Sequence, residues 1–271
     1  IYYFIVPKKK ILIFTDLDGS LLDKETFKFD VIKDYFKELV RNGIIIIPNS
    51  SKTEAELLDF NEQNNLDLSF ITENGSSIHG LNKIHHNLPD KIIISRTINE
   101  IRNVYEENIS LDFKNKTTHI LELEIEVQQK ILGLPLDKIK LAIKRDHSLP
   151  IKFNGTEIEK KEFTKILKNS GLTIQTGGRI MNVCDNVNKS IAMSKALQLI
   201  RKQLDDEVIT IGVGDNENDI EMIEQTDYPC LVKNDNFDSS LINIDNLIKS
   251  SEPSPLGWAD VIKTAIQKIE S

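Results

Sequence analysis

The sequence predicts an α/β protein with a doubly wound parallel sheet and a second, α+β domain inserted in its middle. In both terminal parts of the chain, short apolar segments alternate with segments of helical periodicity. This pattern is typical of strands that are buried on both faces and joined by crossover helices. From about residue 81 to residue 183 the alternation stops, and strand-like and helical segments are mixed. A chain of 271 residues is long enough for a core and a further domain.

Composition excludes several classes of protein. Hydrophobic residues make up 39% of the chain and charged residues 28%, which is ordinary for a globular protein. A net charge of -8 argues against a nucleic-acid-binding surface. No apolar stretch is long enough to span a membrane, and we expect a cytoplasmic protein. Cys184 and Cys230 lie in apolar stretches, so we expect two buried thiols and no disulfide framework.

The amino-terminal part of the core is expected to alternate strands with helices. Gly43 is placed to end the first helix, and Ser51 and Glu54 have the spacing of a capping box at the start of the second. A sharp turn at Glu73-Asn74-Gly75 ends the third strand. The expected elements are a strand at 11–14, a helix at 31–42, a strand at 44–47, a helix at about 51–64 and a strand at 70–72.

The inserted part and the carboxy-terminal part complete the expected element order. In the insertion we expect strands at 92–95, 151–154, 173–175 and 180–183, and helices at 97–107, 123–132, 136–144 and 157–169. The core pattern then returns with a helix at 188–203, a strand at 208–213, a helix at 217–225, a strand at 228–232 and a helix at 257–269. The predicted domains are a core at 1–80, the insertion at 81–183 and the rest of the core at 184–271.

Two acids follow the first strand. Asp16 and Asp18 stand one residue apart, and Gly19 comes directly after them. In open α/β sheets the active site lies beyond the carboxyl ends of the strands. If the chain stays extended, both carboxylates point the same way and need a cation between them. An ordinary Asp-Gly turn at the end of a strand is the alternative.

Three further loops are expected at the same edge of the sheet. They contain Ser50 and Ser51, Lys189 at the start of a helix, and the acid-rich stretch 214–219. That stretch is not a calcium loop, because Thr226 stands where the bidentate glutamate belongs. A solvated helix amino terminus is its simplest alternative, since acids are favoured there.

Together the four loops resemble the haloacid dehalogenase superfamily of phosphotransferases. Asp16-Leu17-Asp18-Gly19-Ser20 is similar to the nucleophile loop of that superfamily, which more often has threonine at the position of Ser20. Ser50 is similar to the second motif, Lys189 to the third, and the Gly-Asp-x-x-Asn-Asp run at 214–219 to the fourth. The resemblance implies a Rossmann-like core, and the place of the insertion implies a cap domain of the C2B type, in the Cof-like branch.

The resemblance also implies a role for each residue in an Mg²⁺-dependent phosphatase. Asp16 would be the nucleophile that forms an aspartyl phosphate, and Asp18 the acid and then the base. Lys189 would add a fixed positive charge, and Ser50 would bind phosphate oxygens. The implied ligands of the metal are the carboxylates of Asp16 and Asp215, the main-chain carbonyl of Asp18, and Asp219, which would ligate through water or hold Lys189.

Within the superfamily, the chain most resembles the mannosyl-3-phosphoglycerate phosphatase family. The similar runs are Ser50-Ser51-Lys52-Thr53, Glu73-Asn74-Gly75, Thr176-Gly177-Gly178-Arg179 and Pro255-x-Gly257-Trp258. Leu149 stands where the family has a glutamate, so the identity of the sugar in the substrate stays open.

The resemblance implies hydrolysis of mannosyl-3-phosphoglycerate to mannosylglycerate, a compatible solute, by a monomer or homodimer. The expected partner is this small phosphorylated molecule, with no nucleic acid and no membrane. Arg179 could grip the glycerate carboxylate while the two glycines allow close approach; a plain Gly-Gly hairpin is the alternative. Other sugar-phosphate phosphatases, a phosphomutase and a non-catalytic sensor stay open as alternatives. The expected substrate-binding residues are Ser50, Ser51, Lys52, Gly177, Gly178, Arg179 and Asn218.

Overall fold

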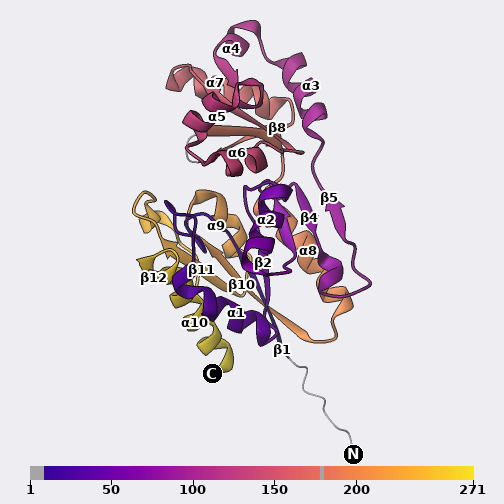
Figure 1. Ribbon diagram of the computed structural model, residues 1–271, viewed down its shortest axis with the longest axis vertical. Coiled ribbons are helices and arrows are strands. Elements are labelled where there is room, and N and C mark those ends of the chain that lie inside the picture. Colours follow the sequence, from indigo (N-terminus) through magenta and orange to yellow (C-terminus); the bar gives the residue numbers. More distant parts are fainter. Residues whose placement is uncertain (1–8, 178–179) are drawn as a thin grey trace, which may run out of the picture.

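A five-stranded parallel sheet forms the centre of the core in this computed structural model, which describes residues 9–177 and 180–271 (Figure 1). Its strand order is β12-β11-β10-β1-β2, so strands from both ends of the sequence lie side by side. Every neighbouring pair in this sheet is parallel. The strands are β1 (Lys9–Thr15), β2 (Ile45–Pro48), β10 (Glu207–Gly214), β11 (Tyr228–Lys233) and β12 (Ile248–Pro253).

Helices cover both faces of this sheet, as the doubly wound prediction requires. Alternate residues of β1 divide between the two layers: Ile13 packs in one apolar cluster, and Leu12 and Phe14 pack in the other. The first layer contains α1 (Lys33–Arg41), α2 (Glu54–Asn64) and α10 (Leu256–Glu270), and the second contains α8 (Lys189–Gln203) and α9 (Glu217–Glu224).

The third predicted core strand lies in a separate small sheet. β3 (Phe70–Thr72), β4 (Ser77–His79) and β5 (Lys91–Ile93) pair antiparallel. An isolated parallel bridge between Asn49 and Ile71 joins β3 to the loop after β2. The predicted third core strand is present, but it pairs mainly with its own hairpin and joins the loop after β2 only through this bridge. β4 was not predicted, since three residues with one aliphatic side chain carry no periodicity.

The inserted segment forms an α+β cap that lies above the carboxyl ends of the core strands (Figure 1). Its antiparallel sheet has the order β6-β7-β9-β8. Ile101, Phe163 and Val183 belong to one apolar cluster between this sheet and its helices. The domain limits at residues 80 and 183 stay a prediction. The cap elements are β6 (Thr117–His119), β7 (Ser148–Phe153), β8 (Leu172–Gly177), β9 (Ile180–Asp185), α3 (Ile98–Asn108), α4 (Leu111–Asn115), α5 (Ile125–Leu132), α6 (Leu136–Ala142) and α7 (Glu157–Asn169).

The start of α2 differs from its prediction. Thr53, not Ser51, is the N-cap residue, and its capping-box partner is Glu56. Residues 50–52 are instead tied to β3 and the turn after it: Ser50 N donates to Ile71 O, and Lys52 O accepts from Glu73 N. Both cysteines are buried, as expected. Among the helices in the described part of the chain, none combines the length and apolar character that crossing a membrane would need.

Candidate active site

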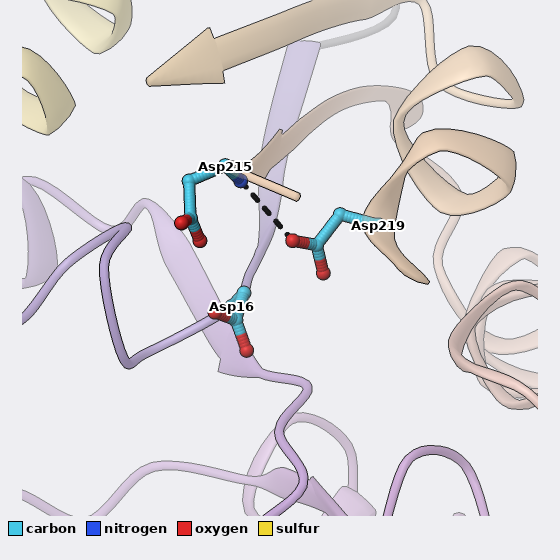
Figure 2. Close-up of side chains that lie close together, drawn as sticks. All are labelled: Asp16, Asp215 and Asp219. Carbon is cyan, nitrogen blue, oxygen red and sulfur yellow. Dashed lines mark hydrogen bonds between the residues drawn. The ribbon is translucent and has the colours of Figure 1, made fainter. Parts of the chain in front are cut away.

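Three carboxylates meet where β1 and β10 end. Asp16 follows β1, Asp215 follows β10, and Asp219 lies in the first turn of α9. One carboxylate oxygen from each residue lies within 4.8 Å of the other two, and all three side chains are buried (Figure 2). The backbone brings them together, because Asp16 N donates to Val213 O across the parallel ladder. The carboxyl ends of neighbouring parallel strands thus form the site, as the sequence predicts.

Lys189 is the cation at the centre of this cluster. Its Nζ lies 2.6 Å from Asp16 Oδ1 and 2.6 Å from Asp219 Oδ1. The Lys189 side chain is 2% exposed, so its two ion pairs are shielded from water. Lys189 is the first residue of α8, and Asn49 Nδ2 holds its carbonyl oxygen at 2.9 Å. A buried lysine is stable here because two carboxylates face it.

The remaining oxygens of Asp215 and Asp219 have defined partners. Asp219 Oδ2 accepts from the backbone N–H groups of Asp215 and Asn216, so both of its oxygens are engaged. Asp215 Oδ1 accepts from Ser20 Oγ at 3.0 Å, and its Oδ2 accepts from Asn234 Nδ2 at 2.8 Å. Asp219 is therefore placed to hold Lys189, whereas Asp16 keeps one oxygen without a protein hydrogen bond among the described residues.

Glycines allow the loops to approach this closely. A Cβ on Gly214 would lie 2.2 Å from the Cβ of Asp219, and a Cβ on Gly19 would lie 2.6 Å from Asp215 Oδ2. Gly19 also has a φ of +87°, which favours glycine. Packing thus requires both motif glycines, and turn geometry also requires glycine at position 19.

One lysine cannot neutralise three buried carboxylates. Burial raises the pKa of Asp16 to about 8, against the lowering effect of Lys189. Burial and the facing Asp219 raise the pKa of Asp215 to about 6. Burial opposes the charged form of Lys189, but Asp16 and Asp219 raise its pKa above the ordinary value. Such a surplus of hard anionic oxygens fits a divalent cation such as Mg²⁺.

We predict that the chelated protein loses stability as the pH rises. The folded-state pKa values of Asp16 and Asp215 lie above 3.8, so unfolding releases protons in this range and the free energy of unfolding falls with pH. We therefore expect a lower Tm at about pH 8 than at about pH 6 with EDTA present, and a larger gain in Tm from Mg²⁺ at the higher pH. Asp16→Asn should reduce the difference in Tm between the two pH values. A chelated Tm that rises between these pH values would contradict the assignment.

Asp18 faces a different cation. Its Oδ2 lies 2.7 Å from Lys52 Nζ, and its Oδ1 is buried without a partner in the described residues. Burial disfavours the charge on Lys52, but Asp18 and Glu56 raise its pKa above the ordinary value. Lys52 also lies over the ring of Phe27, 5.3 Å from its centroid. The sequence predicts Lys52 as a substrate ligand, and the structure gives it Asp18 as a partner.

The other predicted substrate residues surround the cluster in part. Ser50 is buried, and its Oγ accepts from Lys52 N. Asn218 is exposed and lines a cavity with Lys189. Ser51 O accepts from Arg145 of the cap, and Gly177 ends β8. Gly178 and Arg179 lie outside the described residues, so their role stays a prediction.

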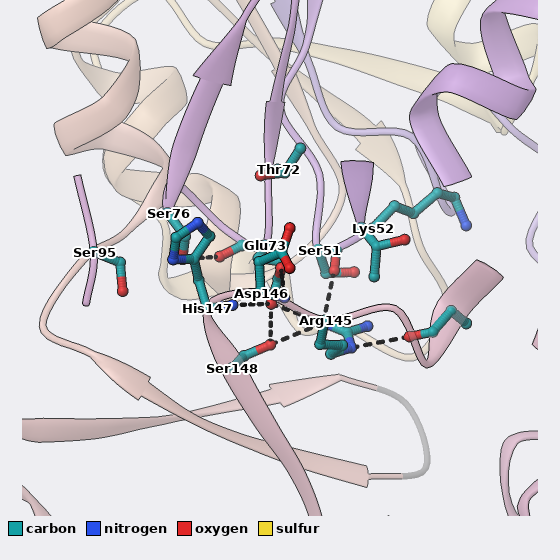
Figure 3. A network of polar contacts seen from close by, with 12 residues as sticks. Ser51, Lys52, Thr72, Glu73, Ser76, Ser95, Arg145, Asp146, His147 and Ser148 are labelled. Carbon is teal, nitrogen blue, oxygen red and sulfur yellow. Dashed lines mark hydrogen bonds and ion pairs between the residues drawn. The ribbon is translucent and has the colours of Figure 1, made fainter. Parts of the chain in front are cut away.

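A polar network joins the core to the cap beside Ser51 (Figure 3). Glu73 accepts from the backbone N–H groups of Asp146 and His147 and from Ser148 Oγ, and Arg145 Nη1 lies 3.9 Å away. Reasoning from the sequence missed this network and Asn234. Asn234 follows β11, and the rule that active-site groups follow strand ends could have found it. No local signal points to the Glu73 contacts.

Comparisons with known proteins agree with this geometry. The haloacid dehalogenase-like hydrolase family matches residues 13–238. A Persephonella marina protein named glucosyl-3-phosphoglycerate/mannosyl-3-phosphoglycerate phosphatase is 28% identical over 96% of this chain and 98% of its own length. A Methanococcoides burtonii protein of the same name is 30% identical over the same shares.

Solved structures show the same fold. A phosphatase of the superfamily from Bacteroides thetaiotaomicron superposes with a TM-score of 0.67 and 17% identity, covering 97% of this chain and 98% of that one. The fold with its cap, the order of the four loops and the matched length lead to one conclusion: the chain belongs to the haloacid dehalogenase-like hydrolases.

Proposed function

We propose that the protein is an Mg²⁺-dependent phosphatase that hydrolyses a glycosyl-3-phosphoglycerate, in the cytoplasm. In the main case, mannosyl-3-phosphoglycerate would yield mannosylglycerate and phosphate. The observation that carries the proposal is the buried Asp16 carboxylate, which Lys189 holds at 2.6 Å with Asp215 beside it. The names of two relatives that match almost the whole chain support the choice of substrate.

In the first half-reaction, a free carboxylate oxygen of Asp16 attacks phosphorus. The bond from phosphorus to the glycerate oxygen breaks, and Asp18 gives its proton to that departing oxygen. Lys189 keeps the attacking carboxylate oriented through its bond to Oδ1. In the second half-reaction, Asp18 takes a proton from water, the water oxygen attacks phosphorus, and Asp16 leaves as the carboxylate.

The proposal includes a divalent cation. The carboxylates of Asp16 and Asp215 and the main-chain carbonyl of Asp18 would hold it, and it would neutralise the charge of the phosphate and the acids. Both oxygens of Asp219 already accept protein hydrogen bonds, which supports its role in holding Lys189. Ser20 and Asn234 donate to Asp215 and orient its carboxylate toward the cation.

We predict that the protein releases phosphate from mannosyl- or glucosyl-3-phosphoglycerate in the presence of Mg²⁺. The assay is a free-phosphate screen over both conjugates and a panel of sugar phosphates. We expect kcat/KM for a conjugate to exceed that for every sugar phosphate by about tenfold or more, and EDTA to abolish release. An added phosphoryl acceptor should not reduce free phosphate, which separates a phosphatase from a mutase. The absence of release across the panel would contradict the proposal.

A further inference from the structure

A cavity of about 440 Å³ is lined by Lys189 and Asn218 and by ten further residues, none of which has yet been given a role in the reaction. One wall comes from β8 of the cap, with Thr173 and Gln175. The other wall comes from the core and includes Asn74, Lys189 and Asn218. Asp16 does not line the cavity, but Lys189, which does, bonds to it through Nζ.

Carboxamides dominate the lining of this cavity, and its charges do not favour an anion. Lys189, the one cation among the described residues of the lining, is already engaged by two carboxylates, and Glu217 and Glu221 add negative charge. Carboxamides both donate and accept hydrogen bonds, which matches hydroxyl groups. The six carboxamide side chains are those of Asn74, Gln175, Asn186, Asn188, Asn216 and Asn218.

Asn74 supplies an acceptor with no partner. Its side chain is 6% exposed, and its Oδ1 makes no hydrogen bond among the described residues. The backbone fixes its position: Asn74 N donates to Ser50 O, and φ is 56°. A Cβ on the next residue, Gly75, would lie 2.1 Å from Asn188 O, so this turn packs directly against the start of α8. A buried carbonyl oxygen of this kind calls for a donor from a ligand or from water.

Asn182 supplies a second such acceptor from the cap. Its neighbours Met181 and Val183 pack in the apolar cluster of the cap, so Asn182 points to the opposite face of the sheet. Asn182 pairs with Gln175, a residue of the cavity wall, in the antiparallel register. On that same face Ser148 contacts Glu73 of the core, which shows that this side of the sheet faces the core. Asn182 is 5% exposed and its Oδ1 also lacks a described partner.

We propose that this cavity is a subsite for the hydroxyl groups of the substrate's sugar. Asn74 lines it from the core as a neutral acceptor, and Asn182, which does not line the cavity itself, supplies a second one beside Gln175 of the cap wall. The inference rests on the proposed function, and it names the residues that recognise the sugar. A neutral acceptor binds an O–H group and gains nothing from a phosphate or carboxylate oxygen. The subsite therefore selects the glycosyl part of the substrate and leaves the anionic part to other groups.

The test compares Asn74→Gly and Asn182→Leu on substrates with and without the sugar. Glycine keeps the positive φ of residue 74 while it removes the amide. We expect kcat/KM for mannosyl- or glucosyl-3-phosphoglycerate to fall about tenfold in each variant, and kcat/KM for 3-phosphoglycerate to change by less than about twofold. Asn65→Gly is the matched control, because Asn65 is exposed, has a φ of 50° and lies at the end of α2.

The outcomes separate the subsite from the proposed function. Equal losses on both kinds of substrate would overturn the subsite and leave the function standing. A wild-type protein that hydrolyses the conjugates no better than 3-phosphoglycerate would overturn both. If the wild type instead prefers a plain sugar phosphate, and the variants lose that preference relative to p-nitrophenyl phosphate, the substrate is wrong and the hydroxyl subsite holds.

Discussion

Replacing Asp16 with asparagine is expected to lower phosphate release by about 10⁴-fold or more. Asparagine keeps the shape of the side chain and an oxygen that can accept from Lys189, but it cannot form an acyl phosphate as the carboxylate does. The measurement is steady-state phosphate release with saturating Mg²⁺. Because the buried carboxylate has a pKa of about 8, its removal should leave the Tm of the chelated protein unchanged or higher.

The matched control for this variant is Asp34→Asn. Asp34 lies in the first turn of α1 and is exposed, so the same change there should leave turnover at the wild-type level. Turnover of the Asp16 variant within about tenfold of wild type would remove Asp16 from the role of nucleophile. A variant that is inactive because it is unfolded would be recognised by its lost thermal transition.

Replacing Lys189 with methionine should damage both activity and folding. Methionine fills a similar volume, but it leaves Asp16 and Asp219 facing each other in a buried site without their cation. Removing one partner of a buried ion pair typically costs about 3–5 kcal/mol, and we expect a loss of this size in the free energy of unfolding. Urea denaturation with EDTA present measures this loss, and added Mg²⁺ should restore part of the free energy of unfolding.

Lys195→Met is the control for that loss. Lys195 lies on the same helix and is exposed, so the same substitution there should change stability by less than about 0.5 kcal/mol. An effect of Lys189→Met no larger than that of the control would show that the lysine does not neutralise the cluster. Preserved turnover in the Lys189 variant would separately exclude its proposed role at the phosphate.

Much of the fold and of the central cluster follows from the order of apolar segments along the chain. Asp16 and Asp215 could be placed together because parallel strands bring their carboxyl ends to one edge, whatever lies between them in sequence. Lys189 followed from its resemblance to the third motif of the superfamily, at the start of a helix. The strand ends depend on local periodicity and one topological rule and Lys189 depends on the family motif, and the structure places all three residues in one cluster.

Other features depend on contacts that no local pattern encodes. Ser51 and Thr53 each have a glutamate three residues later, so the sequence offers two registers for the start of α2. The structure uses Thr53, because hydrogen bonds with β3 and the turn after it hold residues 50–52 outside the helix. The pairing of Lys52 with Asp18 likewise arises only when the loops after β1 and β2 meet.

The most direct test of the account is to trap the phosphorylated enzyme. Asp18→Asn should slow the hydrolysis of the intermediate, because it removes the base that activates water. The substrate is p-nitrophenyl phosphate, because its phenolate leaves without the proton that Asp18 would give. After incubation with it and Mg²⁺, acid quenching and peptide mass spectrometry should find one phosphoryl group on Asp16, and none when Asp16→Asn is added to the variant. Phosphate on another residue, or turnover by the wild type with no phosphorylated enzyme under any quench time, would contradict the central claim that Asp16 is the nucleophile.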